Sequence, residues 1–167
     1  MTADIKEKDS PGVIAPPPLI YTLGLGAGYL VDEYIFRLPL VGHGTPDRWE
    51  VQWAIALGVI LFAAGGMLDL LSLLHFRKAK TDVRPWKPTT AIIRGGPFRY
   101  SRNPIYVGMT TAYVGCAFLL DSWWVLAFLL LVLPVMQRGV ILREEAYLEA
   151  KFADDYLSYK RTVRRWV

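Results

Sequence analysis

An uncharged apolar run at residues 51–68, VQWAIALGVILFAAGGML, is the feature that most constrains the fold. A helix rises 1.5 Å per residue and needs roughly 20 residues to cross about 30 Å of hydrocarbon, so this run has spanning length. Hydrophobic residues make up 53% of the 167-residue chain and are gathered in blocks. This pattern predicts an integral membrane protein rather than a soluble domain.

Three further apolar segments predict helices. Residues 19–31 are glycine-rich and follow a proline cluster, and residues 104–120 and 122–137 are separated only by Asp121, which predicts a tight hairpin. Pro104 suits a first helical turn, whereas Pro134 predicts a kink. We therefore expect an all-α integral membrane fold with four transmembrane helices.

The chain length fits one domain, which we place at residues 19–167. The preceding residues 1–18 are charged and then proline-rich, with no apolar core of a signal peptide. We expect them to form a mobile tail. After Leu142, aromatic and apolar residues recur at steps of three and four between charged residues, which predicts an amphipathic helix that lies on or caps one membrane face.

The distribution of basic residues predicts the orientation in the membrane. Residues 77–102 carry eight Lys or Arg residues and one acidic residue, Asp82, whereas the turn at Asp121 has no basic residue. Since basic loops favour the cytoplasmic side, we expect a multi-pass protein with this loop and both termini in the cytoplasm. The loop from His43 to Arg48 would then face outward.

Several features indicate membrane topology or helix packing rather than a functional site. The net charge of +4 comes from basic residues beside membrane segments, so we do not expect nucleic acid as a partner. The two histidines and the single Cys116 have no metal-ligand spacing, so no metal is expected. Small residues at Gly24 and Gly28, with Gly26 between them, indicate close helix packing rather than a nucleotide-binding turn.

The loop at residues 81–103, TDVRPWKPTTAIIRGGPFRYSRN, is the least lipid-like part of the chain. Gly95 and Gly96 permit unusual backbone angles, and cationic and amide side chains precede the helix expected from Pro104. This arrangement resembles a helix N-terminus that receives an anionic group. A connecting loop that serves only topology is the alternative.

Two acidic features are further candidates. Glu144 and Glu145 are adjacent carboxylates at the end of an apolar helix, where a solvated acidic face is the alternative to a binding role. Asp69 lies inside the second apolar segment, about eight residues before Arg77. Charged groups within membranes are costly and mark candidate sites, so Asp69 would bind a cation, act as a base, or pair with a cation such as Arg138.

Two linked motifs carry a family resemblance. The stretch GGPFRYSRNPIYVG, followed about forty residues later by REEAYLEAKFADDYLSYKRTVRR, resembles the isoprenylcysteine carboxyl methyltransferase and phospholipid methyltransferase superfamily of integral membrane enzymes. The resemblance covers about residues 84–165. It implies that these motifs surround S-adenosylmethionine on the cytoplasmic side.

The resemblance assigns roles to individual residues. Glu144 and Glu145 would meet the ammonium or ribose of the cofactor, and Arg102 and Glu145 would be catalytic. Asp69 joins them as a third catalytic candidate because of its position in an apolar segment, not because of the resemblance. The residues implied to bind the cofactor are Gly96, Pro97, Tyr100, Arg102, Asn103, Pro104, Tyr106, Gly108, Glu144 and Glu145. Asn103 stands where many relatives have histidine, and it keeps a polar contact.

The implied function is transfer of a methyl group from S-adenosylmethionine to a lipophilic small molecule or lipid that enters from the membrane. Asp69 lies near where carboxyl-methylating relatives place an arginine, so an amine or a neutral polar headgroup is favoured as acceptor over a carboxylate. Two alternatives stay open. One is a membrane reductase with a nicotinamide cofactor, and the other is a non-enzymatic membrane bundle.

Overall fold

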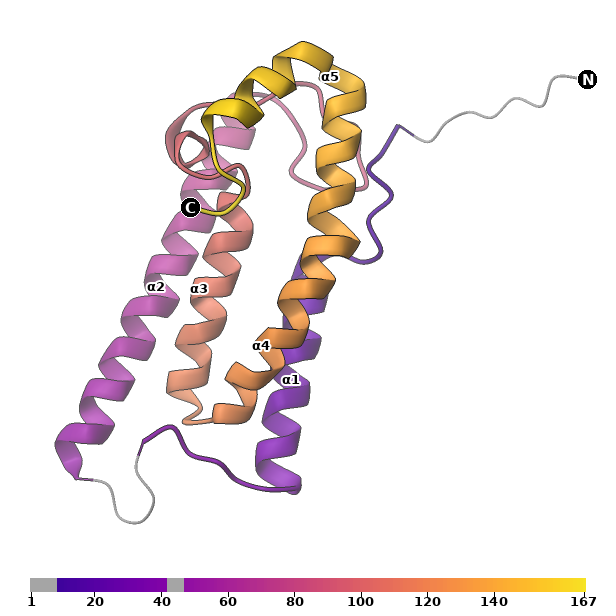
Figure 1. Cartoon of the computed structure of the whole chain (residues 1–167). Helices are drawn as coiled ribbons and strands as arrows, with labels where there is room; N and C mark the ends of the chain where they lie inside the picture. Colours follow the sequence, from indigo (N-terminus) through magenta and orange to yellow (C-terminus); the bar gives the residue numbers. More distant parts are fainter. Residues whose placement is uncertain (1–8, 42–46) are drawn as a thin grey trace, which may run out of the picture.

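The computed structural model describes residues 9–41 and 47–167, and all regular structure in these ranges is helical (Figure 1). Residues 1–8 and 42–46 lie outside the described part, and so does most of the loop expected to face outward. The elements are α1 (Pro17–Tyr34), α2 (Arg48–Lys78), the 3₁₀ helix η1 (Gly96–Arg99), α3 (Pro104–Leu119), α4 (Trp123–Met136), the π-helix η2 (Gln137–Ile141) and α5 (Leu142–Thr162).

The helix expected at residues 51–68 is longer than the apolar run that predicted it. At its start, the Glu50 carboxylate accepts a hydrogen bond from the backbone N–H of Asp47 at 3.1 Å. At its end, Arg77 and Lys78 lie beside the negative end of the helix dipole. These local signals extend the helix beyond the uncharged segment, and Asp69 lies within it.

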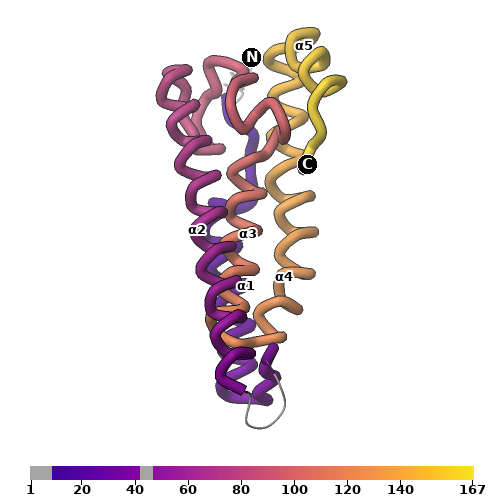
Figure 2. Tube along the Cα trace, turned by 90° about the vertical axis from the view of Figure 1, so that its left-hand side faces the viewer, coloured from indigo at the N-terminus to yellow at the C-terminus, as the bar shows by residue number. Residues whose placement is uncertain are grey.

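The helices pack as two antiparallel pairs, α2 with α3 and α1 with α4 (Figures 1 and 2). Glycines bring α2 and α3 together at two levels, seven residues apart on each helix. A Cβ added at Gly115 would lie 2.7 Å from the carbonyl oxygen of Gly58, and one added at Gly108 would lie 2.8 Å from that of Gly65. Only glycine permits backbones to approach this closely.

Glycines also bring α1 against α4. A Cβ added at Gly28 would lie 2.8 Å from the Cα of Val125, and one added at Gly24 would collide with the side chain of Val132. Gly26 faces open space. The expected packing role is therefore confirmed for Gly24 and Gly28.

The turn between α3 and α4 closes the end of the bundle away from the basic loop. Asp121 adopts a φ of 50°, and its carboxylate accepts a hydrogen bond from the backbone N–H of Val41 at 2.9 Å. Ser122 caps α4 by accepting from the N–H of Val125. The tight hairpin expected at Asp121 is confirmed, and the segment after α1 is fastened to it.

The fourth helix continues through η2 into α5. Pro134 lies inside α4 and has no N–H to donate, and the π-helix begins three residues later. The helical path breaks at Ala153, whose φ is 43°, and the remainder of α5 turns across the top of the bundle (Figure 1). Only this second part of α5 caps the bundle as expected, because residues 142–152 extend α4.

The described part of the expected N-terminal tail lies along the bundle. The N–H of Ile14 donates to the carbonyl of Gly139 at 3.1 Å, and the Ile14 side chain fills the space above this glycine. Arg143 donates to the carbonyl of Gly12 at 2.7 Å. These contacts hold the chain from Gly12 onward, and Pro17 already begins α1, two residues before the segment expected from residue 19. The mobility of the tail stays a prediction.

Two of the described helical stretches are long and apolar enough to cross a membrane, namely Arg48–Lys78 and the continuous stretch Trp123–Thr162. Helix α3 is apolar but shorter. The helical fold class is confirmed, whereas the number and direction of membrane crossings stay predictions.

The glycine contacts predict a position-specific effect on stability. Replacing Gly65 by Ala places a methyl group 2.6 Å from the backbone nitrogen of Ala112, which cannot yield, so α2 and α3 must separate. We expect the free energy of unfolding to fall by about 1–3 kcal/mol, measured by thermal unfolding in detergent. The control is Gly66→Ala, which makes the same change on the same helix facing open space. Equal effects of both substitutions would contradict this packing role.

Candidate functional site

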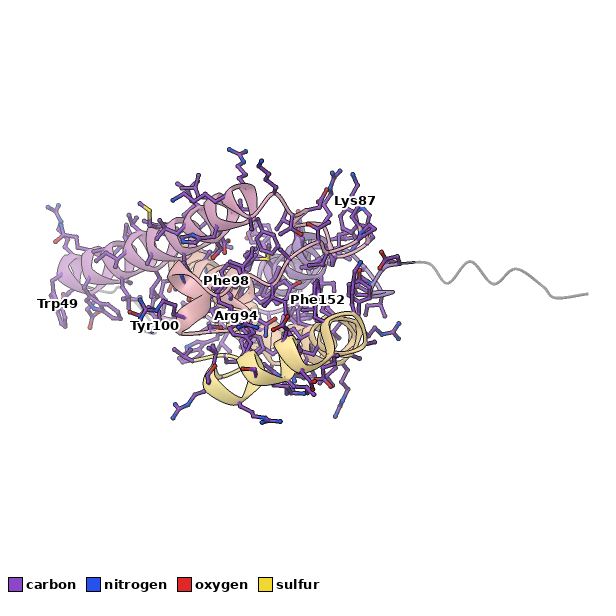
Figure 3. The ribbon with its side chains drawn as sticks, turned by 90° about the horizontal axis from the view of Figure 1, so that it is seen from above. Trp49, Lys87, Arg94, Phe98, Tyr100 and Phe152 are labelled. Carbon is purple, nitrogen blue, oxygen red and sulfur yellow. The ribbon has the colours of Figure 1, made fainter. Side chains whose placement is uncertain are left out.

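The basic loop, the start of α3 and helix α5 surround a cavity at one end of the bundle. Both described chain ends lie near it, since Pro11 lines its wall and the carbonyl of Arg164 accepts from the N–H of Arg102. Seen from above, Arg94 and Phe98 lie between α2 and α5 at this end (Figure 3). The charged residues of the wall are Asp82, Arg84, Arg102, Glu144 and Glu145, and its polar residues include Asn103 and Tyr106.

The backbone of the loop is shaped by glycine and by hydrogen bonds to α5. Gly96 has a φ of 58°, and its missing side chain leaves room for the ring of His75. The buried Phe98 accepts a hydrogen bond through its carbonyl from Tyr159 at 2.7 Å. These contacts fix η1 and direct the next residues into the cavity, as the expected shape-fixing role of the glycines requires.

Glu145 lies between two arginines in a nearly dry environment. Its Oε1 accepts from Arg102 Nη2 at 2.8 Å and from Arg165 Nε at 3.0 Å, and its Oε2 accepts from Arg165 Nη2 at 2.8 Å. The side chains of Arg102 and Glu145 are 7% and 5% exposed. Two guanidinium groups around one carboxylate leave this cluster with an excess positive charge.

One N–H donor of Arg102 has no acceptor among the described residues. Its Nη1 donates to the carbonyl of Lys160 at 3.1 Å, but its buried Nε has no hydrogen-bond partner among the described residues. A buried N–H without an acceptor is costly, so it is suited to an acceptor supplied by a ligand. The excess charge nearby favours an anionic acceptor such as a carboxylate.

Glu144 has a different environment from its neighbour. Successive residues of a helix point about 100° apart, so Glu144 turns toward α3, where Tyr106 donates to its Oε1 at 2.8 Å. Its second oxygen has no hydrogen bond to the described residues, and Glu144 lines the cavity. Glu144 therefore offers a free carboxylate oxygen to a cationic or hydroxyl group.

The structure gathers part of the residue set that the sequence predicts. Arg102, Asn103, Pro104, Tyr106, Glu144 and Glu145 all line the cavity. Gly96, Pro97, Tyr100 and Gly108 do not line it. Gly96 and Pro97 begin η1, Tyr100 is 74% exposed, and Gly108 packs α3 against α2.

Asp69 also lies outside the cavity wall. It is half-buried between α2 and α3, and its Oδ1 lies so close to Gly108 that a side chain at that position would collide with it. This oxygen has no hydrogen-bond partner within residues 9–41 and 47–167. None of the ion pairs found in these ranges joins Asp69 to Arg138, so the pairing suggested by the sequence is not formed.

Sequence reasoning missed the contribution of the C-terminal residues and of two tyrosines. Arg165 lies in a basic stretch that is typical of a solvated tail. The one sequence signal that links it to the site is its position in the second motif, twenty residues after Glu145. Tyr147 accepts from the N–H of Thr89 at 3.2 Å and donates to Asp9 at 2.6 Å, so it ties the loop and the N-terminal segment to α5. Tyr156 is buried in the cavity wall.

Two carboxylates at the rim are held ionised by neighbouring cations. Hydrogen bonds from Arg84 hold the pKa of Asp82 far below its usual range, and those from Lys151 lower the pKa of Asp9. A depressed carboxyl pKa means that these contacts are complete at neutral pH and weaken only in acid. Both pairs are exposed, so they orient the loop and the N-terminal segment rather than stabilise the fold strongly.

The fold and cavity define a helical protein with apolar spans and a charged cavity at one end. The chain matches the family model described as "Phospholipid methyltransferase" over residues 53–155, which include the first motif, the second motif up to residue 155, and most of the residues that line the cavity. The chain belongs to this phospholipid methyltransferase family. The resemblance stated from the motifs is thereby confirmed, and methyltransferase activity associated with membranes is supported.

Individual relatives are more distant. An uncharacterized protein of Haemophilus influenzae is 40% identical over 62 residues, which are 33% of this chain and 98% of that protein. The steroid 5-alpha-reductase DET2 of Solanum lycopersicum is 25% identical over 80% of this chain, which spans about half, 53%, of that protein. The nickel-cobalt-cadmium resistance protein NccN of Alcaligenes xylosoxydans xylosoxydans is 25% identical over 87% of this chain and 68% of its own length. No solved structure matches the chain significantly.

The buried charge cluster predicts a large stability difference between two glutamates on one helix. Glu145→Gln removes the partner of two guanidinium groups, one of them buried, and we expect a loss of about 3–5 kcal/mol. Glu149 pairs with the partly exposed Lys160, so Glu149→Gln should cost less than about 1 kcal/mol. Thermal unfolding followed by circular dichroism compares the two. A Glu145→Gln protein as stable as Glu149→Gln would show that the cluster does not hold the fold.

Proposed function

We propose that this protein transfers a methyl group from S-adenosylmethionine to a lipophilic acceptor at the end of the bundle that carries the cavity, on the cytoplasmic side of the membrane. The observation that carries the proposal is that one cavity is lined both by Arg102, whose buried Nε has no hydrogen-bond partner among the described residues, and by Glu144, whose second carboxylate oxygen has none either. These groups offer one donor for an anion and one acceptor for a cation. The family membership supports the same reaction class.

The wall residues fit the chemical groups of this cofactor. Its amino-acid part carries a carboxylate and an ammonium, for which Arg102 and Glu144 are suitable partners. Glu145 has accepted three hydrogen bonds, and a carboxylate has about four acceptor positions, so one position on Oε2 is left for a ribose hydroxyl or the ammonium. Ile92, Leu148 and Tyr156 provide an apolar wall for an aromatic base.

The cofactor supplies an activated methyl group on a sulfonium, so the protein needs to provide position rather than a nucleophile of its own. Arg102 and Glu144 would fix the two ends of the amino-acid part, and the capping part of α5 and the loop at 81–103 would exclude water. Holding the reacting partners in line contributes most of the rate gain in such a displacement. The walls keep their shape through buried contacts such as Tyr159 with Phe98.

A second hollow provides an approach for an apolar acceptor. It lies between α3 and the stretch from α4 to η2 and is lined by Thr110, Leu133, Pro134, Gln137, Arg138 and Trp166. Thr110 donates to the carbonyl of Tyr106 at 2.7 Å, so this hollow and the cofactor cavity lie one helical turn apart on α3. An acceptor with an apolar tail would lie here and bring its reactive group toward Tyr106.

A reductase that uses a nicotinamide cofactor is the second candidate, and the similarity to the tomato steroid 5-alpha-reductase supports it. The surplus positive charge around Arg102 and Arg165 would then meet a phosphate. The two candidates differ in the cofactor that the cavity holds. A bundle without enzymatic activity would bind neither cofactor.

Calorimetry on the detergent-purified protein tests the proposal. We expect S-adenosylmethionine and S-adenosylhomocysteine to bind in the micromolar range. Glu144→Gln keeps the acceptor for Tyr106 but removes the negative charge, so we expect about 10- to 100-fold weaker binding. Glu33→Gln makes the same change on exposed α1 and should bind like the wild type.

Two outcomes would overturn this assignment. Tight binding of a phosphorylated nicotinamide dinucleotide without binding of S-adenosylmethionine would favour the reductase. Binding of neither cofactor by folded protein, in detergent and in lipid nanodiscs, would favour the non-enzymatic bundle. Equal binding by Glu144→Gln and wild type would remove Glu144 from the cofactor site.

Asp69 is proposed to act on the acceptor rather than on the cofactor. Its partnerless oxygen lies between the helices that carry the loop and the cavity, where it would attract a protonated amine or accept its proton. We expect Asp69→Asn to abolish turnover of the acceptor and to leave the calorimetric Kd for S-adenosylhomocysteine unchanged. Loss of cofactor affinity in parallel with turnover would contradict this division of roles.

A further inference from the structure

The last residues of the chain form a short strap across the site. After α5 ends at Thr162, Val163 adopts an extended conformation and the chain runs back along the start of α3. We define the C-terminal strap as residues 163–167. Its Trp166 donates through Nε1 to the side chain of Gln137 in η2 at 3.3 Å, so the strap connects α3 with the π-helix.

The strap contacts the family motif itself. The carbonyl of Arg164 accepts from the N–H of Arg102 at 2.9 Å. The carbonyl of Arg165 accepts from Ser101 Oγ at 3.3 Å and from Asn103 Nδ2 at 3.0 Å. Three consecutive residues that precede α3 are therefore held in place by two carbonyls of the strap.

The Arg165 side chain reaches the site from the other direction. It binds both oxygens of Glu145, and this fixes the carboxylate plane. Arg102 alone would hold Glu145 through one oxygen and leave it free to rotate. With Arg165 bound, Oε1 of Glu145 is held in place and orients Arg102 through its Nη2. In this orientation the Nε–H of Arg102 has no acceptor among the described residues.

We propose that docking of the C-terminal strap completes the cofactor site, and that Arg165 is a positioning residue that fixes Glu145 and, through it, the free donor of Arg102. This inference rests on the proposed function, because the ligand concerned is the amino-acid part of S-adenosylmethionine. Arg165 binds Glu145 through Nε and Nη2 and does not line the cavity, so it would act on the ligand through that partner.

Coupling between the strap and the cofactor follows from this arrangement. The strap supplies one of the two positive charges around Glu145, and together they leave the excess charge that attracts a carboxylate. Glu145 also raises the pKa of Arg165, so this guanidinium stays charged. Because linkage is reciprocal, a ligand that prefers the docked strap must also stabilise its docking.

The test uses the full-length protein in detergent with S-adenosylhomocysteine as the probe. Arg165→Gln should raise the Kd for this probe by about tenfold or more. Arg164→Gln removes the same charge from the exposed neighbouring side chain and should bind like the wild type. Arg165→Lys, which keeps the charge but not the two-point contact, should fall between them.

Hydrogen exchange gives a second readout that a merely structural role would not move. Addition of S-adenosylhomocysteine should slow amide exchange in the C-terminal strap of the wild type and of Arg164→Gln, but not of Arg165→Gln. Circular dichroism establishes that each variant is folded. If Arg165→Gln does not fold, the Kd of Arg165→Lys is compared with that of the wild type instead, and a higher Kd supports the role of Arg165.

Several results would overturn the proposal. A folded Arg165→Gln, or where that variant does not fold an Arg165→Lys, that binds the probe like the wild type would reduce the strap to a structural element. An equal loss in Arg164→Gln would assign the effect to general charge. Absence of binding in the folded wild type itself would reject the proposed function together with this inference. This result is distinct from the others, because wild type and variants would then all fail to bind the probe.

Discussion

The close backbone contact between α2 and α3 is the constraint on which the rest of the structure depends. Gly58 and Gly65 on one helix meet Gly115 and Gly108 on the other, and backbone atoms occupy the space that side chains would need. In the membrane that the sequence predicts, helices would gain little from burying apolar surface, so close contact over a long interface would contribute most of the packing. It fixes α3 along nearly its whole length.

The fixed position of α3 determines where the site can form. The loop that leaves α2 must return to Pro104 within the space above the helix pair, and His75 meets Gly96 along that path. Helix α5 arrives from the other pair, through a π-helix that follows Pro134. The cavity therefore forms where two rigid helix pairs diverge, and the arginine–glutamate cluster joins them across the gap.

Sequence alone predicts much of this architecture, because apolar runs, prolines and glycines act locally. The four bundle helices, the hairpin at Asp121 and the packing role of Gly28 follow from such signals. The break at Ala153 has no local signal, since alanine favours helix, and the capping part of α5 is placed by tertiary contacts such as Tyr159 with Phe98. The role of Arg165 likewise depends on a contact between residues twenty positions apart, which a basic tail does not reveal.

Glu144 and Glu145 are neighbours in the motif, but their side chains have different environments in the structure. As a sequence, Glu144 and Glu145 are equivalent, and their repulsion suggests that both face water. The helix turns them in different directions, so that Glu145 is enclosed by two guanidinium groups and Glu144 keeps one oxygen free beside Tyr106. A buried ion pair contributes little net stability over an apolar pair, but it fixes geometry. We therefore infer that Glu145 shapes the wall and that Glu144 is the carboxylate with most to offer a ligand.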